Sequence, residues 1–143
     1  MPDIFHEFSI IAKPGPVFAA ITTPSGLNEW WTKTCAGELR SGGVYELGFG
    51  HGVDWRARVT AIVPNEVFEL QMIEAHADWM DTRVRFEILS GTPATPVRFS
   101  HVGWPSNNSH YRVSSFCWAA YLRILRRYVE HGEHVPYEKR LEV

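Results

Sequence analysis

Residues 109–131, SHYRVSSFCWAAYLRILRRYVEH, repeat their apolar side chains every three or four positions. The stripe that this spacing places on one helix face consists of Tyr111, Ser115, Trp118, Leu122, Leu125 and Val129, flanked by Ser114 and Tyr121. Asn107, Asn108 or Ser109 has a side chain suited to cap the first turn, and Gly132 suits the position after the last turn. The sequence therefore predicts a helix of roughly 20 residues or more with one buried face.

The chain before this helix has a period of two, in which apolar and polar residues alternate. Six segments carry the pattern: 4–11, 44–49, 54–61, 68–72, 83–88 and 97–101. Several are separated by residues that favour tight turns, as in Gly50-His51-Gly52 and Pro64-Asn65. The alternation predicts an antiparallel sheet of about six or seven strands, covered on one face and in contact with water on the other.

The polar positions of these strands are mostly charged. The side chains that we expect on the wet face are Glu46, Arg56, Arg58, Glu69, Arg83 and Arg85. Within 54–61 the same alternation assigns Trp55, Ala57, Val59 and Ala61 to the covered face. Because exposed side chains contribute little to stability, we expect alanine at each charged position to change the free energy of unfolding by only about 0.5 kcal/mol.

Two short helices are expected between the first strand and the rest of the sheet. Pro14 and Pro16 favour the first turn of one helix, and residues 24–31 begin with a further proline and form the second. The order of one strand, two short helices, the remaining strands and a long helix is typical of a two-layer α+β fold. We expect a single domain that spans residues 1–143.

Composition narrows the classes of function. The chain has 143 residues, of which 45% are hydrophobic and 21% are charged, as in ordinary globular proteins. Its formal net charge of −2 argues against a nucleic-acid partner, and no apolar run is long enough to insert into a membrane. The two isolated cysteines, Cys35 and Cys117, and the lack of a signal peptide at the N-terminus lead us to expect a cytoplasmic protein.

Four stretches carry a resemblance to a known family: Trp30-Trp31, LGFG at 47–50, FSHVGWP at 99–105 and CWAAYLRILRRY at 117–128. Together with the order of elements, they resemble the START-like (SRPBCC) superfamily, and within it the homologues of the activator of the ninety-kilodalton heat-shock protein ATPase. The resemblance implies a helix-grip fold, in which a curved antiparallel sheet wraps around the C-terminal helix and encloses a cavity. Members of the superfamily bind lipids, hormones, polyketides or flavonoid-like compounds, and some are cyclases or aromatases.

The candidate ligand-binding residues are those that the sheet and the helix would turn toward this cavity. They are Trp31, Phe49, Trp55, Met72, Phe86, Phe99, His101, Tyr111, Ser114, Ser115, Trp118, Tyr121 and Leu122. Large rings with polar tips suit a pocket for a small apolar or aromatic molecule, but they also suit a solid aromatic core. A small hydroxyl on the buried stripe is easier to explain beside a ligand or water, so we expect Ser115 to border an open cavity.

His6 and His101 both fall on the covered face, on strands that the helix-grip topology places side by side. They are either polar groups of the cavity, one of them an acid or base near neutral pH, or a pair of hydrogen-bonded structural histidines. No carboxylate partner accompanies them on that face, and the chain has no nucleophile motif such as G-x-S-x-G. We therefore assign no catalytic residue.

Two groups of possible metal ligands stand out. His131 and His134 are spaced H-x-x-H but flank Gly132 at the end of the long helix, and His76 and Asp78 share a loop with Asp81. Neither group has a convincing third ligand in the sequence, so we expect no metal and no cofactor.

Three functions remain open from the sequence. The first is binding of a small hydrophobic or aromatic molecule in the cavity. The second is a polyketide cyclase or aromatase, in which His101 or Tyr121 moves protons. The third is interaction with a chaperone through the outer surface. A homodimer is left open as the assembly.

Overall fold

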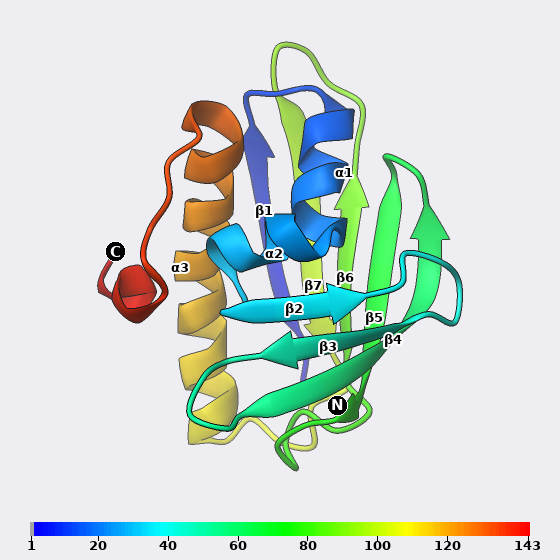
Figure 1. Ribbon diagram of the computed structural model, residues 1–143, viewed down its shortest axis with the longest axis vertical. Coiled ribbons are helices and arrows are strands. Elements are labelled where there is room, and N and C mark those ends of the chain that lie inside the picture. The colour runs from blue at the N-terminus through cyan, green and yellow to red at the C-terminus, as the bar shows by residue number, and fades with distance from the viewer. Residues whose placement is uncertain (1) are drawn as a thin grey trace.

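The computed structural model describes residues 2–143 and has one seven-stranded antiparallel sheet with strand order β1-β7-β6-β5-β4-β3-β2 (Figure 1). Its strands are β1 (Ile4–Ile10), β2 (Thr34–Gly37), β3 (Val44–Gly48), β4 (Asp54–Val63), β5 (Val67–Glu74), β6 (Arg83–Ile88) and β7 (Thr95–Val102). The helices are α1 (Pro14–Thr22), α2 (Pro24–Trp30), α3 (Ser109–His131) and a C-terminal 3-10 helix, η1 (Tyr137–Glu142). The α+β helix-grip fold expected from the sequence is confirmed.

The sheet curves, so that β2 and β3 run across the direction of β1 and β7, and α3 packs along the sheet beside β1 (Figure 1). The short helices α1 and α2 cover part of the same face, and η1 lies against α3. The core lies between these helices and the sheet. Within residues 2–143, no helix is both long enough and apolar enough to cross a membrane.

Local chemistry sets the ends of the helices. The Thr23 hydroxyl caps α2 by accepting a hydrogen bond from the Gly26 amide at 3.0 Å. Of the three candidates for the cap of α3, Asn108 is the one whose side chain accepts from the Tyr111 amide, at 3.0 Å. Gly132 ends α3 in the left-handed region with a φ of 66°, a conformation that costs glycine little.

Strand β2 has no counterpart among the six segments identified by alternation. It is four residues long, reads TCAG, and pairs with β3 from Thr34 opposite Gly48 to Gly37 opposite Tyr45. Apolar and polar residues do not alternate clearly over these four positions, so the sequence pattern does not reveal a strand here. The segment is a strand because it pairs with β3.

The expectation that Ala61 lies on the covered face is wrong. A register shift occurs between Val59 and Ala61, so that Ala61 pairs with Glu69, and Ile62 packs against the core instead. Such a bulge adds one residue to a strand and therefore exchanges the faces of the residues that follow it.

The buried stripe of α3 is rotated from the expected one. Its buried residues are Ser114, Trp118, Leu122, Ile124 and Leu125, whereas Ser115 is only half-buried. Ile124 is fully buried although it lies outside the expected stripe. The helix is covered on more than one side, because α1, α2 and η1 contact it in addition to β1.

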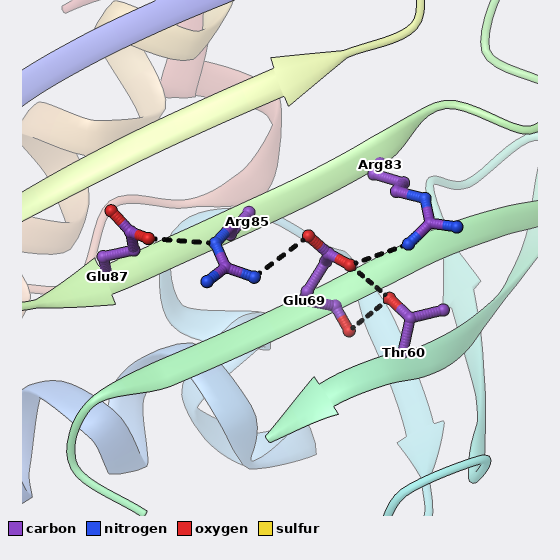
Figure 2. A network of polar contacts seen from close by, with 5 residues as sticks. All are labelled: Thr60, Glu69, Arg83, Arg85 and Glu87. Atoms are coloured by element: carbon purple, nitrogen blue, oxygen red, sulfur yellow. Dashed lines mark hydrogen bonds and ion pairs between the residues drawn. The ribbon is translucent and has the colours of Figure 1, made fainter. Parts of the chain in front are cut away.

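Glu69 departs from the simple picture of a wet face. Its side chain is only 11% exposed and lies at the centre of a polar network on the outer surface of the sheet (Figure 2). It accepts a hydrogen bond from Thr60 at 2.7 Å and pairs with Arg83 at 3.1 Å and Arg85 at 3.2 Å. Burial acts to raise the pKa of the Glu69 carboxyl, but the hydrogen bonds from Thr60, Arg85 and Arg83 outweigh it and hold the pKa below its ordinary value.

Replacing Glu69 with alanine is therefore expected to lower the free energy of unfolding by about 1.5 kcal/mol, more than the 0.5 kcal/mol or so expected at the neighbouring charges. The expected loss of stability is modest because both arginines are partly exposed and can be solvated by water. Urea denaturation of Glu69→Ala beside Glu46→Ala, which is on the same face, measures the difference. Equal losses in the two variants would contradict this account of the network.

Candidate ligand-binding site

Trp118, near the middle of α3, is the centre of an aromatic cluster between the helix and the sheet. Its ring centroid lies 4.5 Å from that of Phe99 on β7 and 5.1 Å from that of Trp31 at the end of α2. Its indole Nε1 donates a hydrogen bond to Nδ1 of His101, also on β7, at 3.1 Å. Side chains of α2, β7 and α3 thus meet at Trp118.

His101 is fully buried and both of its ring nitrogens are engaged. Because the Thr82 hydroxyl donates to the Trp79 carbonyl at 2.6 Å, Nε2 of His101 must donate to the Thr82 oxygen, at 2.8 Å. This arrangement selects the neutral tautomer protonated on Nε2. Burial lowers the pKa of His101 to about 3, with a smaller contribution from His110, so the imidazole is uncharged near neutral pH.

Trp79 belongs to the loop between β5 and β6, yet only 7% of it is exposed. Its ring lies 4.4 Å from that of His101, 5.0 Å from Trp55 and 5.8 Å from Trp104, measured between centroids. A residue of a surface loop therefore fills the end of the cluster near the start of α3. The ring of Trp79 packs directly against the buried histidine.

The indole nitrogens of Trp79 and Trp104 are buried and have no hydrogen-bond partner. Among residues 2–143, the other buried side-chain atom in this condition is Nε of Arg56, outside the cluster. In contrast, Nε1 of Trp30 donates to the Ala20 carbonyl at 2.9 Å. A buried donor without an acceptor costs on the order of 1–3 kcal/mol. The two donors belong to neighbouring rings of the cluster, whose centroids lie 5.8 Å apart.

Many of the predicted site residues meet in this cluster or border it. Ring centroids 4.5–6.3 Å from that of a neighbouring ring of the cluster belong to Trp31, Phe49, Trp55, Phe86, Phe99, His101, Trp118 and Tyr121. Tyr111 joins through Trp104, with centroids 5.5 Å apart, and its hydroxyl donates to the Asp3 carbonyl at 2.7 Å. Burial raises the pKa of Tyr121 to about 12, so its hydroxyl remains protonated.

The other predicted residues carry no aromatic ring. Met72 is buried on β5, and Ser114 is buried on α3. Leu122 lines an open cleft of about 360 Å³ between α3 and β1, together with Phe8 and Ala119. The half-buried Ser115 faces β1, and its carbonyl accepts a hydrogen bond from Nε2 of His6 at 3.3 Å.

His6 and His101 occupy neighbouring strands, as expected, but they do not bind each other. In the register of β1 and β7, His6 pairs with Phe99 and His101 pairs with Ile4. The ring of His6 stacks on Phe99 at 6.1 Å, whereas His101 points toward Trp118 and Thr82. Each histidine thus has its own structural partners.

Trp79 and Trp104 were missed by the analysis of the sequence. Both lie outside strands and helices, where no periodicity assigns a residue to a face. Their residue type could nonetheless have predicted their burial, because tryptophan is highly buried on average and exposing its large ring to water is unfavourable. The pairing of β6 with β7 explains why the two tryptophans meet. Arg83 pairs with Val102, so the loop before β6 and the loop after β7 lie at the same end of the sheet.

The chain is similar to solved structures over nearly its whole length. The solution structure of the Aha1 dimer from Colwellia psychrerythraea is 29% identical, with a TM-score of 0.84 over 93% of this chain and 99% of that one. Protein MLL2253 from Mesorhizobium loti is 19% identical, with a TM-score of 0.83 over 92% of this chain and 99% of that one. DynU16, described as a putative protein in the dynemicin biosynthetic locus, is 18% identical, with a TM-score of 0.77 over 92% of this chain and 48% of that one.

No curated protein matches the sequence. The model of the family described as "Activator of Hsp90 ATPase homolog 1-like protein" matches residues 12–130, which is well over half of the chain. The match takes in strands β2 to β7, the two short helices and nearly all of α3, and begins after β1. The chain therefore belongs to the Activator of Hsp90 ATPase homolog 1-like family.

Proposed function

We propose that this protein binds a small apolar or aromatic molecule that carries a hydrogen-bond acceptor, in the aromatic cluster between the sheet and α3. The observation that carries the proposal is the pair of buried indole donors, on Trp79 and Trp104, without acceptors. A carbonyl or hydroxyl oxygen of a ligand that reached the two indole nitrogens would satisfy them. The surrounding rings supply the apolar contacts that such a ligand needs.

Binding is favoured over proton-transfer chemistry by the state of the polar groups. Both nitrogens of His101 are already engaged, and with a pKa of about 3 this histidine is a poor base near neutral pH. With a pKa of about 12, Tyr121 keeps its proton. A cyclase-like reaction in this cluster would need a base that the two side chains do not provide.

Access to the cluster depends on the loop between β5 and β6. Trp79 covers the cluster from this loop, and its carbonyl accepts hydrogen bonds within the same loop, from the Thr82 hydroxyl at 2.6 Å and the Thr82 amide at 3.1 Å. Outward movement of residues 75–82 would carry the Trp79 ring away from His101 and Trp104. The ligand would then enter from the end of the sheet near the start of α3.

Conservative tryptophan-to-phenylalanine variants test the proposal. We expect Trp104→Phe and Trp79→Phe to weaken binding of the fluorescent probe 8-anilinonaphthalene-1-sulfonate by about five- to tenfold. Each change removes one N–H donor and leaves a smaller aromatic ring at the same position. Trp30→Phe is the matched control, because its donor is satisfied by Ala20. It should bind the probe normally but lose about 1 kcal/mol more stability than the other two variants.

Fluorescence titration and urea denaturation on the same samples measure both quantities. Native mass spectrometry of freshly purified protein gives an independent check, because a bound small molecule appears as added mass. A wild type that binds no probe and carries no added mass would contradict the proposal. Equal probe affinity in all four proteins would contradict the role of the two indoles.

We also propose that the chain forms a homodimer, as the Aha1 of Colwellia psychrerythraea does in its solution structure. Phe116 on α3 is 81% exposed, and Val113, one turn earlier, is 55% exposed. Strand β1 beside this helix is an edge strand and presents Phe5 at 70% exposure. Large exposed apolar side chains beside a free strand edge favour association with another chain.

Phe116→Ser is expected to shift the protein from dimer to monomer in sedimentation velocity, because it removes the most exposed of the three apolar side chains. Leu39→Ser, at a 44% exposed position in the loop between β2 and β3, is the control and should leave the assembly unchanged. A wild type that sediments as a monomer at all concentrations would rule the dimer out.

A further inference from the structure

The loop between β5 and β6 meets the first turn of α3 at a cluster of two histidines and an aspartate. His76 and Asp78 belong to the loop, and His110 is the second residue of the helix. Nδ1 of His110 lies 2.9 Å from Oδ2 of Asp78, and Nδ1 of His76 lies 3.8 Å from the same oxygen. Within residues 2–143, this is the group of three potential metal-ligating side chains whose donor atoms all lie within 4.8 Å of one another.

These separations are close to those of a metal site. Two ligands bound tetrahedrally to zinc at 2.0–2.1 Å lie about 3.3 Å apart. The two distances to the Asp78 oxygen fall on either side of this value. All three donor atoms lie within 4.8 Å of one another, so side-chain rotation would bring them onto a common ion. Ligation through Nδ1 of His76 would replace the hydrogen bond that this atom accepts from the Asp78 amide at 3.1 Å.

The donor set has the chemistry of a zinc site. Two imidazoles and one carboxylate suit zinc and its neighbours among the divalent first-row metals, with a fourth position left for water. The hydrogen bond from His110 holds the pKa of the Asp78 carboxyl below its ordinary value, so that ligand is ionised at neutral pH. A bound ion would take the place of the proton that Nδ1 of His110 now donates to Asp78.

The surroundings hold Asp78 and His110 in place. Asn108 caps α3 through its carbonyl oxygen, and its Nδ2 lies 3.4 Å from Oδ2 of Asp78. The His110 ring packs against Trp104 with centroids 5.6 Å apart and planes at 87°. Second-layer contacts of this kind orient metal ligands and strengthen binding. The remaining His–carboxylate pairs, such as His134 with Glu29 at 2.6 Å, lack a third ligand within the described residues.

We propose that His76, Asp78 and His110 form a binding site for a divalent transition-metal ion of the zinc type, which links the β5–β6 loop to the start of α3. The site is distinct from the aromatic cluster, and its occupancy does not depend on a bound organic molecule. Because Trp79 directly follows Asp78, an ion at this position would restrain the loop that carries that ring.

Metal titration of the untagged, chelator-treated protein tests the site. Isothermal titration with Zn²⁺ is expected to show one ion per chain, and Co²⁺ to produce visible absorption bands typical of nitrogen and oxygen ligands in low coordination. His76→Ala and His110→Ala should each weaken Zn²⁺ binding by about tenfold or more. His134→Ala, which alters an exposed histidine–carboxylate pair elsewhere, is the matched control and should bind as the wild type does.

His110 helps to hold the first turn of α3, whereas the side chain of His76 is largely exposed, so His76→Ala decides the question if His110→Ala does not fold. Millimolar or weaker binding by the wild type would overturn the proposal. Wild-type affinity in His76→Ala, or loss of binding in His134→Ala, would also overturn it, because the ion would then lie elsewhere.

Discussion

Replacing Arg140 with alanine is expected to lower the free energy of unfolding by about 3 kcal/mol, which is a change of more than a hundredfold in the unfolding equilibrium. Arg140 is 2% exposed, and its guanidinium donates to three backbone carbonyls: Asn28 at 2.5 Å, Thr32 at 3.0 Å and Val135 at 3.0 Å. Alanine would leave these buried acceptors without their charged donor. It would also release η1 from the turn between α2 and β2.

Urea denaturation measures this loss, and Lys139→Ala is the control because its exposed side chain lies one residue away. We expect the control to change the free energy of unfolding by about 0.5 kcal/mol or less. The C-terminal helix η1 also contacts the aromatic cluster, since the Tyr137 hydroxyl donates to the Phe49 carbonyl at 2.8 Å. A loss below 1 kcal/mol or so in Arg140→Ala would mean that the C-terminal segment is not held as described.

Mild acid is expected to destabilise the protein through His101. Its pKa is lowered to about 3 in the fold, against about 6.5 in the unfolded chain. Between these values the unfolded state binds more protons, so stability rises with pH and falls as the pH drops below about 6.5. By pH 5 this one group accounts for a loss of about 2 kcal/mol.

The measurement is urea denaturation at pH 7, 6 and 5, with His101→Gln as the variant that does not titrate. The variant is expected to be less stable than the wild type at pH 7, because glutamine cannot reproduce the bonds to Trp118 and Thr82, but its stability should depend less on pH. The same slope in both proteins would show that His101 is not the group responsible. Comparison above pH 5 limits the contribution of the carboxylates, which titrate at lower pH.

The long helix and most strands are recognisable in the sequence because each has a regular spacing of apolar residues. The pattern over 109–131 predicts α3 within its observed bounds, and alternation locates six of the seven strands. Prediction from the spacing of apolar residues fails where that spacing is irregular. The bulge in β4 moves Ala61 to the outer face, and β2 is too short to show a period. Glu69 looks like any other charged residue of the wet face until three strands bring Thr60, Arg83 and Arg85 around it.

The sequence by itself determined the fold, its single buried layer and the aromatic character of that layer, because periodicity reports which face of an element is apolar. Only the tertiary structure decided that Trp79 turns inward, that Arg140 is buried, and that His110 joins His76 and Asp78. All of these residues lie in loops, in the tail or at a helix end, where no period applies. The meeting of Trp79, His76 and Asp78 with His110 follows from antiparallel pairing, which places the end of β7 beside the start of β6 and so brings the two loops together. Arg140 is buried because its guanidinium binds carbonyls of Asn28, Thr32 and Val135.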